Sequence, residues 1–91
     1  MNNQLVGRYW DSEGTTDLEL ESNREYRFIG KDGSNFRNGT WGAEGSMLYF
    51  DDKSCPYTYS KAPYGDPQDV LNIQCGDGSI FDRTWWRKPR D

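Results

Sequence analysis

Short apolar segments recur along this chain, and residues that favour turns separate each segment from the next. Gly, Asn, Asp or Ser stands in almost every gap, where these residues allow positive backbone angles or local hydrogen bonds. No apolar spacing keeps a helical period over ten residues, so the pattern favours strands. The clearest apolar segments are Leu5-Val6, Tyr9-Trp10, Leu18-Glu19-Leu20, Tyr26-Arg27-Phe28, Gly39-Thr40-Trp41 and Met47-Leu48-Tyr49-Phe50.

Alternation of apolar and polar residues identifies the clearest hairpin. Leu18 and Leu20 alternate with acidic residues, and Tyr26 and Phe28 continue the same period after a turn at residues 22–24. Similar patterns predict eight strands spaced about ten residues apart, which indicates an all-β antiparallel meander closing into a barrel or sandwich. We expect strands at residues 5–10, 17–21, 25–28, 36–41, 47–50, 57–59, 70–75 and 80–86.

Strand length and glycine placement refine this expectation. The predicted strands are short, about five residues each, so we expect Trp and Phe rings to fill the interior in place of a ligand cavity. Gly39 inside a strand indicates a bulge or the close approach of another backbone segment. The least regular stretch spans residues 60–69 and contains two prolines. Gly76-Asp77-Gly78 is expected to form a hairpin turn.

Length and composition fit one domain over residues 1–91. Two domains in 91 residues would each be too small to bury a stable core. Only 33% of the residues are apolar but 15% are aromatic, so a few large rings must supply much of the core. The formal net charge of -4 disfavours nucleic-acid binding as the main role. No segment is long and apolar enough to predict a membrane helix.

The two cysteines, Cys55 and Cys75, allow one intramolecular pairing. Cys55 precedes Pro56 and is expected outside a strand, whereas Cys75 ends a predicted strand, where strand edges can approach. A disulfide would close a loop of about 20 residues and contribute on the order of 3 kcal/mol through the unfolded state. Both states stay open at this point. A protein with this disulfide would be periplasmic or secreted, and a protein with two free thiols would be cytoplasmic.

Catalytic and metal chemistry find little support in the sequence. The chain contains no histidine, so the usual base for a serine or cysteine nucleophile is missing. Two cysteines without a histidine do not complete a zinc site, and we expect no metal and no cofactor. Several carboxylates fall in predicted turns, where Asp favours local hydrogen bonds. They are Asp11, Glu13, Asp51, Asp52, Asp66, Asp69 and Asp77. We therefore expect no enzymatic activity.

The opening segment Leu5-Val6-Gly7-Arg8-Tyr9 resembles the Leu-x-Gly-x-Trp strand that opens small bacterial lipocalin-like domains. Tyr9 occupies the aromatic position, and Trp10 lies beside it. Gly39-Thr40-Trp41 with the apolar strand after it, and Phe81-Asp82-Arg83 near the end, extend the resemblance over nearly the whole chain. The resemblance implies a meandering antiparallel barrel. It implies no single activity, because such domains bind small ligands or serve as inhibitors and accessory modules.

The last predicted strand carries two adjacent tryptophans, Trp85 and Trp86. Neighbouring strand residues face opposite sides, so one ring is expected to point outward, where it could mark a partner surface. Aromatic rings with cations could clamp single-stranded nucleic acid, but cations that balance acidic neighbours are the simpler interpretation. The cations of this region are Arg83, Arg87, Lys88 and Arg90.

Surface chemistry supplies the leading functional hypothesis. Tyrosines near residues 60–69 suit protein recognition or stacking on sugars, although Tyr57 and Tyr59 also fit ordinary packing on one sheet face. The acidic residues beside them suit a basic surface. We expect a noncatalytic inhibitor or immunity-type protein that binds a protein partner with a basic surface. The alternative is a lipocalin-like carrier or a lectin-type module for a small apolar or sugar ligand. The candidate partner-binding residues are Tyr57, Tyr59, Tyr64, Asp66, Asp69 and Trp86.

Overall fold

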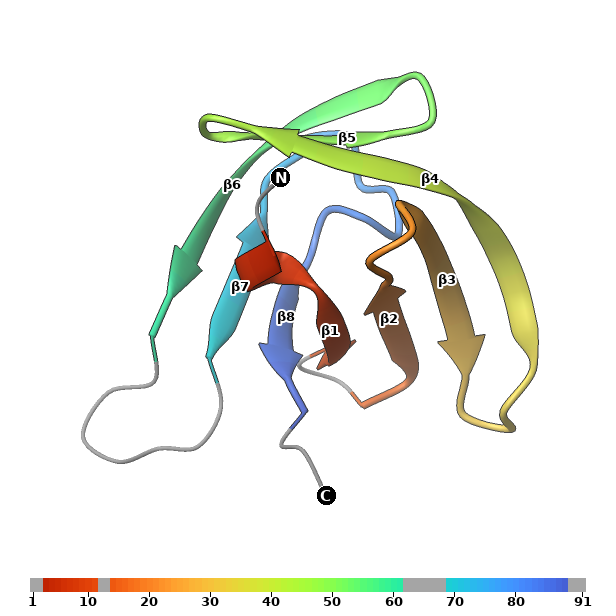
Figure 1. Ribbon diagram of the computed structural model, residues 1–91. Helices are drawn as coiled ribbons and strands as arrows, with labels where there is room; N and C mark the ends of the chain where they lie inside the picture. The colour runs from red at the N-terminus through yellow and green to blue at the C-terminus, as the bar shows by residue number, and fades with distance from the viewer. Residues whose placement is uncertain (1–2, 12–13, 62–68, 89–91) are drawn as a thin grey trace.

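The protein folds into eight β-strands, as the computed structural model in Figure 1 shows. The structure describes residues 3–11, 14–61 and 69–88. A short 3-10 helix, η1 (Asn3–Leu5), precedes the first strand. The strands are β1 (Gly7–Asp11), β2 (Thr16–Leu20), β3 (Glu25–Gly30), β4 (Asn35–Glu44), β5 (Met47–Phe50), β6 (Lys53–Ser60), β7 (Val70–Ile73) and β8 (Thr84–Arg87).

Each strand pairs antiparallel with the next along the chain, and β8 pairs with β1 to close the barrel. Figure 1 shows the long, curved β4, which runs beside β3 over its first half and beside β5 over its second. The predicted all-β antiparallel meander is therefore confirmed, and it closes as a barrel. The described residues contain no α-helix.

Aromatic rings fill the centre of the barrel. Alternation along each strand directs every second side chain inward, so Leu18 is buried while its neighbour Asp17 stays partly exposed. The Phe50 and Phe81 rings stack with their centres 4.4 Å apart. Rings in such contact leave no room for a ligand between them. The fully buried rings are those of Tyr9, Tyr26, Phe28, Phe50, Phe81 and Trp85.

Two buried side chains from outside the strands complete the core. Leu5 comes from η1, and Phe81 comes from the connection between β7 and β8. The guanidinium carbon of Arg37 lies 4.9 Å from the centre of the Phe81 ring and covers it. Segments before β1 and before β8 therefore pack against the barrel interior.

Two strands are much longer than predicted. β4 has 10 residues and β6 has 8, so the expected length of about five is wrong for both. β4 continues through Gly42 because β5 supplies cross-strand partners there. β6 includes Cys55 and Pro56, since the Pro56 ring is exposed and its carbonyl accepts a hydrogen bond from the Gln74 N–H. The prediction that Cys55 lies outside a strand is therefore wrong.

The predicted hairpin turn between the last two strands is also wrong. β7 ends at Ile73 and β8 begins at Thr84, so Gly76-Asp77-Gly78 belongs to a longer connection over residues 74–83. The Asp77 carboxylate accepts a hydrogen bond from the Ser79 N–H at 3.0 Å, which folds this segment on itself. Burial of Phe81 then draws the chain inward before β8 starts.

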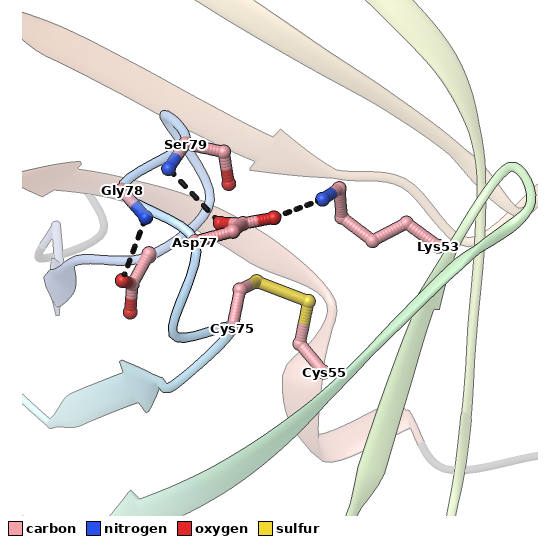
Figure 2. Close-up of a disulfide and its surroundings, with 7 residues drawn as sticks. Lys53, Cys55, Cys75, Asp77, Gly78 and Ser79 are labelled. Atoms are coloured by element: carbon pink, nitrogen blue, oxygen red, sulfur yellow. Dashed lines mark hydrogen bonds and ion pairs between the residues drawn. A yellow bond between two sulfur atoms is a disulfide. The ribbon is translucent and has the colours of Figure 1, made fainter.

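Cys55 and Cys75 form a disulfide, as Figure 2 shows. It links β6 to the connection after β7, across a Cα–Cα distance of 4.6 Å. Lys53 and Asp77, each two residues away from one of the cysteines, form an ion pair across the same junction. A disulfide is compatible with an oxidising compartment such as the cell exterior. The described part of the chain contains no helix long and apolar enough to cross a membrane.

Gly39 is needed for the close approach of side chains, and not of a backbone segment. A Cβ atom at Gly39 would lie 2.8 Å from the Tyr26 ring and would also meet the Asp51 carboxylate. The Tyr26 hydroxyl donates a hydrogen bond to Asp51 at 2.8 Å, which holds both groups beside the glycine. The strand that contains Gly39, β4, pairs with β3, and the irregularity in their register lies between Phe28 and Ile29 and not at Gly39.

Candidate functional site

A shallow hollow of about 290 Å³ opens on the outer surface of the barrel. The outward side chains of β1 and β2 line it together with the β1–β2 connection, the β3–β4 turn and the residue that follows β8. We call it the cationic hollow. Its charged and aromatic lining consists of Arg8, Trp10, Asp17, Lys31 and Lys88.

Strand alternation explains why these side chains meet outside the barrel. In β1 the Tyr9 ring is buried, so its neighbours Arg8 and Trp10 face outward. The register of β1 with β2 sets Trp10 opposite Asp17. Lys88 follows β8 and donates its backbone N–H to the Arg8 carbonyl at 2.8 Å, which brings it to the same side.

One carboxylate organises the cations of the hollow. The Asp17 carboxylate accepts a hydrogen bond from Arg8 Nε at 2.8 Å and forms an ion pair with Lys88 Nζ at 2.7 Å. The Lys88 ammonium also lies 5.1 Å from the centre of the Trp10 ring, within the range of a cation–π contact. Lys31 has no ion-pair partner among the described residues. Three cations therefore surround one shared carboxylate.

An apolar row continues from the hollow across the outside of the barrel. The register places Trp10 opposite Trp86, and Trp86 opposite Val70. These side chains are partly exposed, whereas Trp85 beside them is fully buried. Trp86 is thus the outward member of the tryptophan pair. We call this set the outer tryptophan row, which consists of Trp10, Trp86 and Val70.

The predicted residues Tyr57 and Tyr59 lie elsewhere, on the inward-facing side of β6. Both pack partly buried against the core, as expected for alternate residues on one sheet face. The Tyr57 hydroxyl donates to the Gly45 carbonyl at 3.3 Å, and the Tyr59 hydroxyl donates to Asp69 at 2.6 Å. Burial and this second hydrogen bond raise the pKa of Tyr59. Tyr64 and Asp66 lie outside the described residues, so their proposed role stays a prediction.

Arg87 faces the barrel interior and ties its first and last segments together. Its guanidinium donates to the Val6 carbonyl at 2.9 Å, to the Tyr9 hydroxyl at 2.9 Å and to the Gln4 carbonyl. Its Nε donates to the Tyr59 hydroxyl at 3.0 Å. Burial raises the pKa of Tyr9, and the positive charge of Arg87 opposes this rise only in part. Arg87 is therefore not available as a surface cation for nucleic acid.

Gly7 makes room for this arrangement. A Cβ atom at Gly7 would lie 3.2 Å from the guanidinium carbon of Arg87 and closer still to one of its nitrogens. The Arg87 guanidinium also lies 5.0 Å from the centre of the Tyr9 ring. Gly7 and Tyr9 of the opening segment thus form the space in which the Arg87 guanidinium lies.

Asp11 is buried at the end of β1, so its predicted place in a turn is wrong. Its carboxylate accepts hydrogen bonds from Arg83 at 2.8 Å and from the Thr15 N–H and hydroxyl at 2.9 Å each. Burial alone would raise the pKa of Asp11, but the hydrogen bonds from Thr15, Thr16 and Arg83 outweigh it and lower the pKa. These partners give Asp11 a structural role. Within the described ranges, no group of three or more His, Cys, Asp or Glu side chains could hold a metal ion.

The sequence pointed to Trp86 and placed Lys88 among the cations near it, but it missed Arg8, Trp10 and Lys31. Trp10 could have been assigned to the outer face from the alternation about Tyr9, since both residues lie in the first predicted strand. Its place beside Trp86 depends on the register of the closing pair, β1 with β8, which a single sequence does not reveal.

Comparison with protein-family models, with curated proteins and with solved structures gives no match for this chain. The residues of the cationic hollow and of the outer tryptophan row are therefore the basis of the functional inference.

Proposed function

We propose that this protein is a noncatalytic binding module that contacts a protein partner through the outer tryptophan row. One observation carries the proposal: Trp10 and Trp86 lie side by side on the exterior, while aromatic rings occupy the interior. A binding protein whose interior is packed must present its recognition surface outside. Tryptophan is enriched among the residues that contribute most to the free energy of protein association, because it buries a large area at small entropic cost.

The test compares partner capture by three variants of the immobilised protein. Trp86→Ala and Trp10→Ala should each weaken capture from lysate by about tenfold or more, because such residues typically contribute at least 2 kcal/mol at an interface. Tyr49→Ala is the matched control, since Tyr49 is an exposed aromatic residue on β5, away from the closing strands. Equal capture by all three variants, each with an unchanged circular dichroism spectrum, would refute the proposal.

A finer proposal is that the module is an inhibitor or immunity-type protein that acts on a basic partner surface. The net charge of -4 and the small size support this class. The acidic surface it needs would come from the stretch at residues 60–69, including Tyr64 and Asp66. Capture with Tyr64→Ala and Asp66→Ala tests it separately, and recovery of the partner at the parental level would exclude this stretch.

We also propose that the fold is of the lipocalin-like kind. The closed meander of eight antiparallel strands supports this relation. The carrier alternative has less support, because the Phe50, Phe81 and Phe28 rings occupy the space that an apolar ligand would need. A lectin-type role is also disfavoured at the hollow, where the Lys88 ammonium lies over the Trp10 ring on which a sugar would stack.

A further inference from the structure

We propose that the cationic hollow binds the carboxylate of an acidic peptide segment in the partner protein. The inference rests on the proposed function, because the hollow is continuous with the outer tryptophan row through Trp10. It adds the chemistry of one segment of the partner, distinct from the basic surface proposed to meet residues 60–69. An acidic side chain of this segment enters the hollow, and the apolar residues that flank it lie along the row.

The hollow holds more hydrogen-bond donors than acceptors. Arg8 uses its Nε–H on Asp17, and its two terminal nitrogens have no partner among the described residues. Lys88, which has three N–H donors, forms an ion pair with the same carboxylate, and Lys31 has no ion pair within the described part of the chain. A carboxylate supplies the missing acceptors, and it fits the planar fork of an arginine.

Charge favours the same occupant. The described residues that line the hollow include three cations and one carboxylate, although the whole chain has a net charge of -4. Glu19, the cross-strand partner of Arg8, is bound to Arg27 at 2.6 Å. The positive charge of Arg8 also helps to lower the pKa of Glu19, but no hydrogen bond joins the two side chains. A positive hollow on an acidic protein steers an acidic segment to this one place.

The surroundings distinguish a peptide from a nucleic acid. Single-stranded nucleic acid needs aromatic platforms along a groove that carries many cations. Here Lys88 covers the Trp10 ring, so a base cannot stack on that face of the ring. Arg87 points into the barrel, so its charge is not available to a phosphate. Val70 and Trp86 instead continue the surface as an apolar row, which suits the apolar side chains of a peptide.

Isothermal titration with a short synthetic peptide of alternating Leu and Glu tests the inference. A matched peptide with Gln in place of Glu should bind roughly tenfold more weakly, because hydrogen bonds to charged groups contribute about 1.5–3 kcal/mol. Lys31→Gln should likewise weaken binding of the acidic peptide by roughly tenfold on the same grounds. The control is Arg24→Gln, which removes the same charge from an exposed site in the turn between β2 and β3, outside the lining of the hollow, and should change the affinity by less than about twofold.

Equal affinity for the two peptides, or equal losses in Lys31→Gln and Arg24→Gln, would overturn the inference. Tighter binding of oligothymidylate than of the acidic peptide would also overturn it, in favour of nucleic acid.

These failures are separable from failure of the proposed function. If Trp86→Ala reduces partner capture while the acidic peptide does not bind, the tryptophan row stands and the acidic partner is wrong. If the peptide binds at the hollow but Trp86→Ala leaves capture unchanged, the acidic-peptide site stands and the role of the tryptophan row is wrong.

Discussion

At the scale of single residues, the Arg87 side chain has four hydrogen-bond partners from distant segments of the described chain. Its guanidinium contacts two carbonyls before β1 and two tyrosine hydroxyls, one on β1 and one on β6. A partly buried cation of this kind is stabilising only when its donors are largely satisfied, and four of the five N–H donors of Arg87 have acceptors among the described residues. Its loss would free η1 and leave the Val6 carbonyl without its partner.

Arg87→Met should lower the free energy of unfolding by about 2–4 kcal/mol, because it removes hydrogen bonds from a charged group to partly buried acceptors. In a domain of this size, each kcal/mol lowers Tm by about 4–8 °C. Thermal unfolding followed by circular dichroism measures the effect, with Lys61→Met as the exposed control. A Tm for Arg87→Met within the error of the control would contradict the assigned role.

Asp11 should make stability dependent on pH. Its pKa in the folded protein is lower than the ordinary value of 3.8, so its contribution is complete above that value and is lost as pH falls through the lowered pKa. Asp11→Asn should therefore be less stable than the parent at pH 7, and the difference should shrink in acid. Urea unfolding of both proteins at neutral pH and below pH 4 measures it. A difference that stayed constant or grew in acid would contradict this assignment.

At the scale of structural elements, the connection between β7 and β8 determines how the core closes. It carries Phe81 into the ring cluster, and it is held to β6 by the Cys55–Cys75 disulfide and the Lys53–Asp77 ion pair. The chain around the disulfide is therefore attached at two points, as Figure 2 shows. Both attachments keep Phe81 in place.

Phe81→Ala should destabilise the protein by about 3–5 kcal/mol, the usual cost of removing a fully buried Phe side chain. Urea unfolding of the parent, Phe81→Ala and the exposed control Tyr49→Ala measures this difference. Tyr49→Ala should change the free energy of unfolding by less than about 1 kcal/mol. Similar values for the two variants would mean that Phe81 does not belong to the core.

Loss of the disulfide should reduce stability by about 3 kcal/mol, because the cross-link restricts the unfolded chain. The double variant Cys55→Ala, Cys75→Ala and the parent, compared by urea unfolding, give this value. A thiol assay on the parent, folded and then unfolded without reductant, should detect no free thiol. Two free thiols in the unfolded parent would contradict the disulfide.

At the scale of the whole molecule, the barrel was more predictable than its surface. Alternation about Leu18, Tyr26 and Phe28 predicts strands because a half-buried strand repeats every two residues. Boundaries failed at Gly42 and Pro56, since residues that discourage strands in isolation are accepted where a neighbouring strand pairs with them.

The candidate site was predictable only in part. The outward position of one tryptophan in the pair 85–86 follows from local alternation. The meeting of Trp86 with Trp10, and of Lys31 with Arg8, depends on barrel closure and on the β3–β4 turn, which bring distant parts of the sequence together. Likewise, the interior position of Arg87 follows from partners more than seventy residues away. Contacts between residues so far apart in the chain produce no periodic pattern in a single sequence.

The central claim is that recognition takes place on the outside of a filled barrel. The indole N–H signals of the four tryptophans in a two-dimensional NMR spectrum test it most directly, during titration with the acidic Leu–Glu peptide and then with a fatty acid. The peptide should shift the signals of Trp10 and Trp86, and neither ligand should shift that of the buried Trp85. A shift of the Trp85 signal with the fatty acid, while Trp10 and Trp86 stay unchanged with the peptide, would contradict the account and indicate an internal carrier site.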